Sequence, residues 1–352
     1  MIKSFLEYSP YALLNNNKLN IYLSSIEDLF YENKINMVAV DNPIFISGLS
    51  RSGTTSIANF LDKFDGLSSY KYNNLPFIHC PIIWSYFSKF YYFGLKDTER
   101  LHGDGIMVGT NNADAFEEIF WKIYLEKNKL KFDTVLENEN NDDYNIYIKY
   151  KIKKLLYLTN GKRYFSKNNY NILRLKYLNK QFISPKFLIC FRNPIDTAIS
   201  MTKIDKRFSG FEKKNKYFNK ILNAIGHYEF GSRKKAININ QENFEKVNFL
   251  WSKNKFFEGY LLQWIDIYKF IVNNYSYLNN IILVDNKDFC EKTEQRKVIC
   301  NFLNLNHKND KFGLSKYSEY DKSSHSGKEI SLSLEIYQEL KRLSFENFKT
   351  FK

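Results

Sequence analysis

Short apolar runs alternate along the chain with longer segments whose apolar residues recur every three or four positions. The short runs are typical of buried strands and lie at 44–47, 163–167, 186–191 and 281–285. Strands separated by helices form a mostly parallel sheet, because a parallel connection needs a crossover. We therefore expect an α/β fold of the three-layer P-loop type, with helices flanking a central, mostly parallel sheet.

Several helices have recognisable start signals. One is expected to begin near Thr54, one at the capping-box spacing of Asp114 and Glu117, and one at Pro194. The second of these is predicted to run through Tyr124. Further helical patterns cover 144–158, about 212–275, 293–303 and the region from about 330 onward.

The chain is predicted to form a single domain over residues 1–352. It contains no internal repeat and no linker rich in Pro, Gly or Ser that would mark a boundary. Residues 84–158 are expected to form a mostly helical lid inserted into this domain. Residues 290–352 are expected to form a C-terminal helical region.

The stretch "NPIFISGLSRSGTTSIANFLDKF", residues 42–64, has the pattern of a phosphate-binding loop. A strand leads into Gly48, and a helix follows Gly53, so the backbone N–H groups between them can converge on an anion. Thr54 and Thr55 add hydroxyl donors. A nucleoside-triphosphate loop has Lys after its second glycine, whereas here that position is Thr54 and the cation is Arg51, inside the loop. The plainer interpretation of this pattern is a tight turn between strand and helix.

A second element makes an anion site the better hypothesis. In "CFRNPIDTAIS", Arg192 follows a predicted strand and Ser200 lies eight residues further on, two turns into the next helix. An Arg at a strand end and a Ser on the facing side of the next helix can together hold a second phosphate.

These two elements together resemble the sulfotransferases that use 3'-phosphoadenosine 5'-phosphosulfate (PAPS). In that family an Arg- or Lys-Ser-Gly-Thr-Thr loop surrounds the 5'-phosphosulfate, and "RSGTT" here is similar to the protein-tyrosine and bacterial branches. The resemblance implies that the donor is bound by Ser50, Arg51, Ser52, Gly53, Thr54 and Thr55. It also implies that Arg192 and Ser200 hold the 3'-phosphate, and that the product is adenosine 3',5'-bisphosphate. The likeness covers about residues 42–66 and 163–203.

The resemblance also implies catalytic roles. Lys167, at the end of a strand, matches the family's lysine that reaches the bridging oxygen of the donor, with a solvated turn lysine as the plainer alternative. Arg51 would neutralise the phosphosulfate from inside the loop. Sulfuryl transfer is an in-line displacement like phosphoryl transfer, so positioning and cations should carry most of the catalysis. We expect no metal ion.

The general base is not where the cytosolic small-molecule branch has it. That branch has a histidine two residues after the lysine, whereas this chain has Asn169, and an amide cannot accept the proton. The sequence offers His102 with Asp104 as its orienting partner, and Glu118 or Glu117 as alternatives. His102 is slightly favoured, because flanking glycines allow a close approach to a ligand; a packing role for the histidine and a first-turn role for the glutamates remain open.

The C-terminal part of the chain suggests further donor contacts. In the family a loop near the C-terminus often covers the 3'-phosphate, and "DKSSHSGKEIS" lies in a corresponding place. Ser323, Ser324 and Lys328 are the candidate contacts. The strand "IILVD" ends at Asp285, which resembles the magnesium-binding strand of a kinase.

Composition narrows the class of protein only slightly. The chain has 352 residues, of which 44% are hydrophobic, enough for a substantial core. Its 52 Lys and Arg against 38 Asp and Glu give a net charge of +14, which suits an anionic ligand but is spread along the chain. The four cysteines lack metal-ligand spacing and are expected to be reduced core residues.

No apolar run approaches the roughly 20 residues that span a bilayer, and no signal peptide is recognisable, so we expect a cytoplasmic protein. The sequence thus predicts a cytoplasmic sulfotransferase acting on a carbohydrate or small metabolite, without nucleic-acid partners. The aromatic content would also suit a lipid headgroup, a phenol or a peptide tyrosine as acceptor. Two alternatives stay open: a P-loop kinase that uses ATP, with Asp285 on magnesium, and a non-catalytic protein that binds anions, nucleic acid or an acidic membrane.

Overall fold

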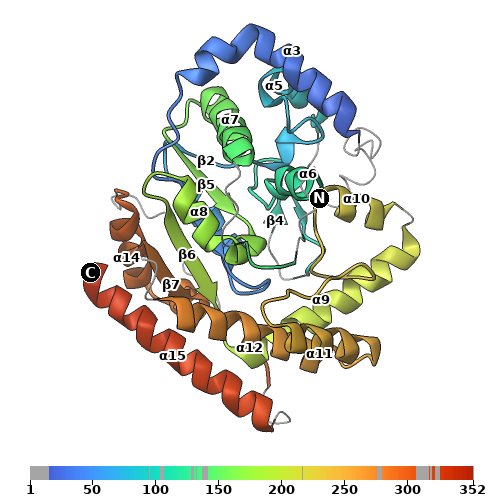
Figure 1. The fold of residues 1–352 in the computed structure, drawn as a ribbon, viewed down its shortest axis with the longest axis vertical. Coiled ribbons are helices and arrows are strands. Elements are labelled where there is room, and N and C mark those ends of the chain that lie inside the picture. Colours follow the sequence, from blue (N-terminus) through green and yellow to red (C-terminus); the bar gives the residue numbers. More distant parts are fainter. Residues whose placement is uncertain are drawn as a thin grey trace.

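A five-stranded sheet, all of whose strand pairs are parallel, forms the centre of the molecule (Figure 1). The strand order is β2-β5-β1-β6-β7. The strands are β1 (Ile44–Ser47), β2 (Leu67–Ser68), β5 (Arg163–Lys167), β6 (Lys186–Phe191) and β7 (Ile281–Asp285). The computed structural model describes residues 16–94, 96–103, 107–127, 131, 133–136, 142–215, 217–275, 280–306, 317, 319–321 and 326–351.

Helices cover both faces of this sheet. They are α3 (Asn17–Asn36), α4 (Thr54–Leu61), α5 (Pro81–Tyr91), α6 (Glu118–Lys127), α7 (Asp142–Thr159), α8 (Leu175–Gln181), α9 (Pro194–Lys214), α10 (Phe218–Ala224), α11 (Gln241–Ser252), α12 (Phe256–Asn274), α13 (Asn286–Glu291), α14 (Thr293–Leu303) and α15 (Lys328–Phe351). Short 3-10 helices lie at Tyr72–Asn74 and Asn169–Leu173, and β3 (Thr98–Glu99) pairs antiparallel with β4 (Met107–Val108). Among the described residues, no helix is both long enough and apolar enough to span a bilayer.

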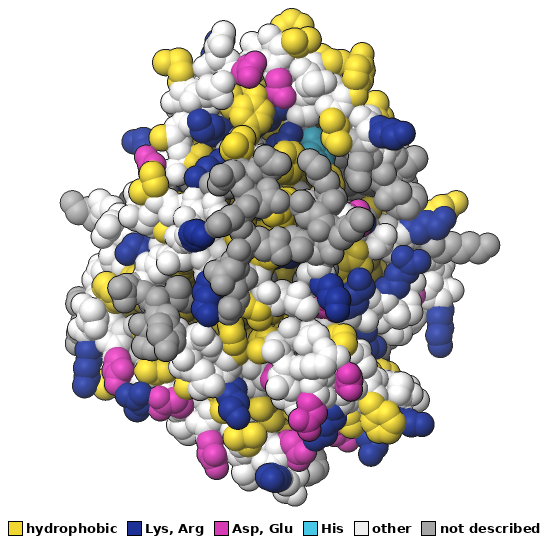
Figure 2. Space-filling view, viewed as in Figure 1, with side chains coloured by type: hydrophobic (Ala, Val, Ile, Leu, Met, Phe, Trp, Pro, Cys, Tyr) yellow, Lys and Arg dark blue, Asp and Glu magenta, His cyan; other side chains and the backbone are white. Residues whose placement is uncertain are grey.

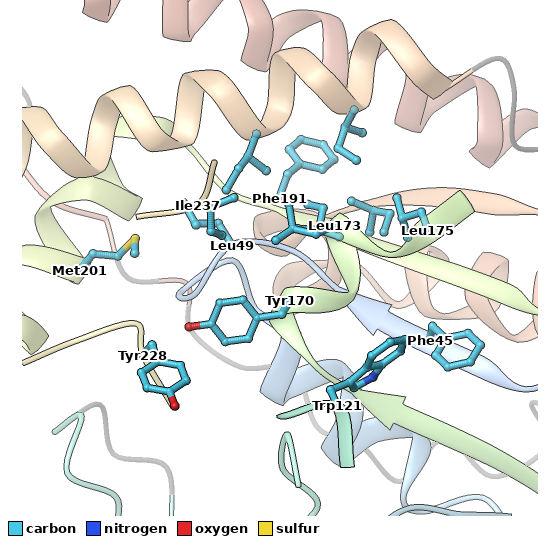
Figure 3. Close-up of a cluster of buried hydrophobic side chains, with 14 of the residues drawn as sticks. Phe45, Leu49, Trp121, Tyr170, Leu173, Leu175, Phe191, Met201, Tyr228 and Ile237 are labelled. Atoms are coloured by element: carbon cyan, nitrogen blue, oxygen red, sulfur yellow. The ribbon is translucent and has the colours of Figure 1, made fainter. Parts of the chain in front are cut away.

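The strands are apolar throughout because both of their faces are buried. Side chains alternate between the two faces: in β6, Phe187 and Ile189 point to one core and Leu188 and Cys190 to the other. The smaller core is filled by α4, α13 and α14. The larger core, part of which is drawn in Figure 3, is filled by α9, α12, α15 and the segments after β5. The three-layer α/β fold predicted from the sequence is confirmed.

The segment 84–158 contains most of α5, all of α6 and most of α7. Its last helix, α7, contacts β2 and β5 and packs against α3 and α5. Ile152 and Leu155 of α7 are buried in the larger core. This helix therefore belongs to the layer that covers the sheet, and a lid formed by the rest of the segment stays a prediction.

One helical prediction was wrong in its extent. Residues 212–275 are not a continuous helical region, because the chain between α10 and α11, residues 225–240, is non-helical. Gly226 has a φ of 73°, and a Cβ there would lie 2.6 Å from Glu118 Cγ. Glycine is needed at this position both for its backbone conformation and for space. The consequence is functional, since this stretch carries polar side chains into the candidate site described below.

The last helix completes the exposed edge of the sheet. Among the described strands, β7 pairs only with β6, so its outer backbone groups have no strand partner in this part of the chain. Asn347 of α15 accepts a hydrogen bond from the N–H of Leu283 at 3.0 Å, and the hydroxyl of Ser344 donates to the carbonyl of Leu283 at 2.8 Å. These side chains replace a sixth strand and close the edge.

We predict that Asn347→Ala lowers the free energy of unfolding by about 1–3 kcal/mol, because it leaves the buried N–H of Leu283 without a partner. Urea denaturation measures this change. Asn248→Ala is the control, since Asn248 is exposed and its amide donates to the carbonyl of Phe244 in its own helix; its effect should stay within about 0.5 kcal/mol. Equal effects of the two variants would contradict a structural role for Asn347.

Candidate active site

The glycine-rich loop, residues 48–53, connects the carboxyl end of β1 to α4. Gly53 is the N-cap residue of α4 and has a φ of 100°, and a Cβ there would lie 2.1 Å from Asn286 Oδ1. Gly48 has a φ of 143°, and a Cβ there would lie 2.4 Å from the carbonyl oxygen of Cys190. Both glycines are required by the close approach of the loop to β6 and α13. The loop is therefore held against the sheet with the N-terminus of α4 open to an anion.

A pocket of about 220 Å³ lies over this loop and over the end of β6. The residues that line it include the loop residues Ser50, Arg51, Gly53, Thr54 and Thr55, together with Arg192. Ser52 is fully buried and does not line the pocket. The structure thus places five of the six predicted loop residues on one surface.

The two predicted anion motifs meet beside this pocket. Arg51 adopts a left-handed backbone conformation, with a φ of 71°, and its Nε donates a hydrogen bond to Ser200 Oγ at 3.0 Å. Arg192 Nε donates to the hydroxyl of Tyr317 at 3.2 Å, and that hydroxyl donates to Asp196 Oδ2 at 2.9 Å. Residues 149 positions apart in the chain are therefore in direct contact.

Tyr317 is a site residue that the sequence reasoning missed. Its ring lies under the guanidinium of Arg192, 4.9 Å from the ring centroid, and it lines the pocket. Burial raises the pKa of Tyr317, opposed by the charge of Arg192, so its hydroxyl stays protonated. No local pattern marks this tyrosine among the 26 of the chain.

Lys167 lies at the end of β5, next to β1 in the sheet, and lines the same pocket. Its Nζ is 2.7 Å from Asp114 Oδ1. Burial alone would raise the pKa of Asp114, but the charge and hydrogen bond of Lys167 outweigh it and hold that pKa well below its ordinary value. Asp114, expected only as a helix cap, is therefore an ionised partner of the predicted catalytic lysine.

Asn169, two residues after Lys167, links the loop to a further pair of polar side chains. Its Oδ1 accepts a hydrogen bond from Thr54 Oγ1 at 3.1 Å, and its Nδ2 donates to Glu229 Oε1 at 2.5 Å. Glu229 Oε2 lies 3.1 Å from His227 Nε2. The sequence reasoning missed Glu229 and His227, because it assigned the segment that carries them to a helix.

A second, smaller pocket of about 60 Å³ adjoins the first. The two share several polar lining residues: Thr55, Arg100, His102, Asp114, Lys167, Asn169, His227 and Glu229. Tyr72, Val108, Phe116, Tyr170 and Ile225 add apolar walls to the smaller pocket. A ligand in the first pocket can therefore face a second ligand in the smaller one across a ring of polar groups.

Of the side chains predicted as general base, His102 lines the two pockets and Glu117 and Glu118 do not. His102 lines both pockets, and its ring packs edge-on against Phe208 at 5.6 Å and Phe230 at 6.2 Å between centroids. Its expected partner Asp104 lies outside the described residues, as do Ser323 and Ser324. Lys328 begins α15 with an exposed side chain and does not line either pocket.

Glu117 and Glu118 are turned away from the pockets into the core. Glu117 accepts hydrogen bonds from the hydroxyl of Tyr164 at 2.8 Å and from Asn171 at 2.7 Å. Glu118 accepts two from the guanidinium of Arg174, at 2.8 and 2.7 Å. Both carboxylates are buried in these contacts and line neither pocket, which favours structural roles for them over the role of general base.

Asp285, the candidate magnesium ligand of a kinase, also makes hydrogen bonds within the fold. Its Oδ1 accepts from the N–H of Lys287 at 2.8 Å, which caps α13, and its Oδ2 accepts from the hydroxyl of Tyr337 at 3.1 Å. Burial raises the pKa of Asp285. Within the described ranges, no group of three or more His, Cys, Asp or Glu side chains is arranged to hold a metal ion.

The family model of sulfotransferases matches residues 43–248, more than half of the chain, and the chain belongs to the sulfotransferase family. This confirms the family expected from the sequence. Among solved structures, sulfotransferase STF9 from Mycobacterium avium is 10% identical with a TM-score of 0.47, over 81% of this chain and 69% of that one. Sulfotransferase STF1 from Mycobacterium tuberculosis H37Rv is 12% identical with a TM-score of 0.44, over 82% of this chain and 74% of that one. No curated protein matches the chain.

We predict that Glu118→Ala destabilises the fold by about 3–5 kcal/mol, because it leaves the buried Arg174 guanidinium without its carboxylate. Thermal and denaturant unfolding measure this loss. Glu126→Ala is the control on the same helix: Glu126 is mostly exposed and 3.9 Å from Lys122, so its loss should cost about 1 kcal/mol or less. A stable Glu118→Ala protein without activity would return Glu118 to the list of candidate bases.

Proposed function

We propose that this sulfotransferase moves a sulfuryl group from PAPS to a hydroxyl or amine of a carbohydrate or small metabolite, without a metal ion. The observation that carries the proposal is the direct contact between the glycine-rich loop and the second motif, through Arg51 Nε and Ser200 Oγ. A donor with phosphates at both its 5' and 3' positions needs two anion sites a short distance apart. A nucleoside triphosphate has its phosphates in one chain and does not.

We assign one phosphate of the donor to the loop and the other to the end of β6. The N–H groups at the start of α4, with Thr54 and Thr55, suit the 5'-phosphosulfate, because a helix N-terminus favours an anion. Arg192 and Ser200 suit the 3'-phosphate, and the contact with Tyr317 orients the guanidinium. Arg51 lines the pocket and contacts Ser200, so its guanidinium can reach either phosphate.

We assign Lys167 to the leaving group. As the acceptor oxygen bonds to sulfur, the bond from sulfur to the 5'-phosphate oxygen breaks, and negative charge grows on that oxygen. Lys167 lines the pocket beside the loop, and rotation about its side-chain bonds can turn its ammonium from Asp114 toward this oxygen. Its charge is then most valuable in the transition state.

The alternatives fit the structure less well. A kinase would need a lysine after Gly53 and a free carboxylate for magnesium, whereas Asp285 caps α13 and does not line the pocket over the loop. A nucleic-acid binder would gather its cations along a groove. On the face shown in Figure 2, Lys and Arg side chains are instead scattered among acidic, apolar and polar ones. A cytoplasmic location stays a prediction from the sequence.

Calorimetric titration with adenosine 3',5'-bisphosphate tests the donor site. We expect micromolar binding without metal, and weaker binding of ATP with magnesium. Arg192→Ala and Arg51→Ala should each weaken the bisphosphate by about 10-fold or more, since hydrogen bonds to charged groups contribute about 1.5–3 kcal/mol. Arg342→Ala, on the exposed face of α15, is the control and should bind normally. Tight ATP binding with no bisphosphate binding would sink the proposal.

Lys167→Ala tests the leaving-group role. We expect kcat to fall by about 10²-fold or more while KM for the donor changes little, because the lysine acts mainly on charge that develops during transfer. The measured rate is the release of bisphosphate as the sulfuryl group of PAPS passes to water or to a supplied acceptor. Lys162→Ala, exposed just before the start of β5, should leave kcat unaltered. Normal turnover in Lys167→Ala would remove the lysine from the mechanism.

A further inference from the structure

We infer that Glu229 is the general base of the transfer, and that Asn169 and His227 hold its carboxylate in position. This inference rests on the proposed sulfuryl transfer and names the residue that receives the acceptor's proton. The carboxylate comes from the non-helical segment between α10 and α11, far in sequence from both donor motifs.

The carboxylate of Glu229 is held by a donor on each oxygen. Asn169 Nδ2 donates to Oε1 at 2.5 Å, and His227 Nε2 lies 3.1 Å from Oε2, where the Nε2–H tautomer donates. The His227 ring is in turn stacked on Phe208, with centroids 5.6 Å apart and planes at 16°. Asn169 is held by Thr54. Because a carboxylate has about four acceptor sites, two contacts leave room for an acceptor hydroxyl.

The position of this carboxylate relative to the donor loop is what suggests its role. Asn169 touches the first residue of α4 with one end of its amide and Glu229 with the other. A single side chain therefore separates Glu229 from the loop, and Glu229 lines both pockets together with Lys167. An amide at position 169 cannot take a proton, but it can bring a carboxylate to the place where one is needed.

The other carboxylate in this ring suits a different task. Asp114 forms the ion pair with Lys167, and its pKa is held well below the ordinary value, so it is a poor proton acceptor. Glu117 and Glu118 are buried in structural contacts outside the pockets. His102 lines the pockets and is the competing candidate, which the experiment below includes.

The proposed step is a single in-line displacement at sulfur. A lone pair of the acceptor oxygen forms the new O–S bond while the acceptor's proton passes to a carboxylate oxygen of Glu229. The S–O bond to the 5'-phosphate breaks, and its electron pair stays on the phosphate oxygen near Lys167. Glu229 then returns the proton to solvent. No oxidant, reductant or metal enters this step.

The test uses Glu229→Gln, which keeps the size and shape of the side chain but not its basicity, and Glu229→Ala, which opens space for a small base. Both variants should bind adenosine 3',5'-bisphosphate within about twofold of the unaltered protein. Their release of bisphosphate from PAPS should be slower by about 10²–10⁴-fold. Sodium formate should restore part of the rate to Glu229→Ala, because formate can occupy the place of the lost carboxylate. Glu245→Gln, exposed on α11, is the matched control and should behave normally.

Normal turnover in both variants would overturn the assignment. Loss of bisphosphate binding would also overturn it, as would a loss of turnover that formate does not restore. Either result would indicate a structural role for Glu229. Loss of turnover in His102→Gln together with normal turnover in Glu229→Gln would assign the base to His102 instead. His227→Gln, which retains an N–H donor, should keep more activity than His227→Ala if His227 positions the carboxylate. Failure of the unaltered protein to bind the bisphosphate would reject the proposed function itself, which separates that failure from an error about Glu229.

Discussion

The parallel pairing of β1 with both of its neighbours is the constraint on which the site depends. Because β1 lies between β5 and β6 in parallel register, the chain segments that follow all three strands emerge at the same edge of the sheet. The loop at 48–53, Lys167 and Arg192 each follow or end one of these strands. The glycines at 48 and 53 then allow the loop to lie against β6 and α13 at distances that a side chain would prevent.

The charged side chains of the site have partners of different kinds. Arg192 rests on a tyrosine ring and Lys167 on an ionised Asp114. Glu229 is held by neutral or weakly basic donors, an amide and an imidazole, rather than by an arginine. The contrast with Glu118 is instructive, because the guanidinium of Arg174 binds both oxygens of that carboxylate and so makes it a structural group.

Several of the strands and one of the helices could be predicted from the sequence with their observed bounds. The strands at 44–47, 163–167, 186–191 and 281–285 and the helix at 293–303 follow the apolar pattern and coincide with the structure. The prediction of helix over 212–275 was wrong because it passed over a local stop signal. Helix α10 stops just before Gly226, which has a φ of 73°, and the N–H of His227 donates to the carbonyl of Leu222 at 2.8 Å, the backbone pattern of a helix that ends at a glycine. The surrounding segment carries Glu229 and His227, so the same error concealed both residues.

The sequence by itself determined the family, the α/β fold and the spacing of the two predicted anion motifs, because these depend on residues close together in the chain. A strand, a glycine-rich turn and a helix start are local, and so is the spacing of Arg192 and Ser200 within one strand end and one helix. Only the tertiary structure decided which carboxylates face the pocket. The four carboxylates concerned are those of Asp114, Glu117, Glu118 and Glu229. Residue type does not separate their roles, but each carboxylate meets a different partner from a remote segment. Burial and partner, not residue type, separate a structural carboxylate from one that can receive a proton.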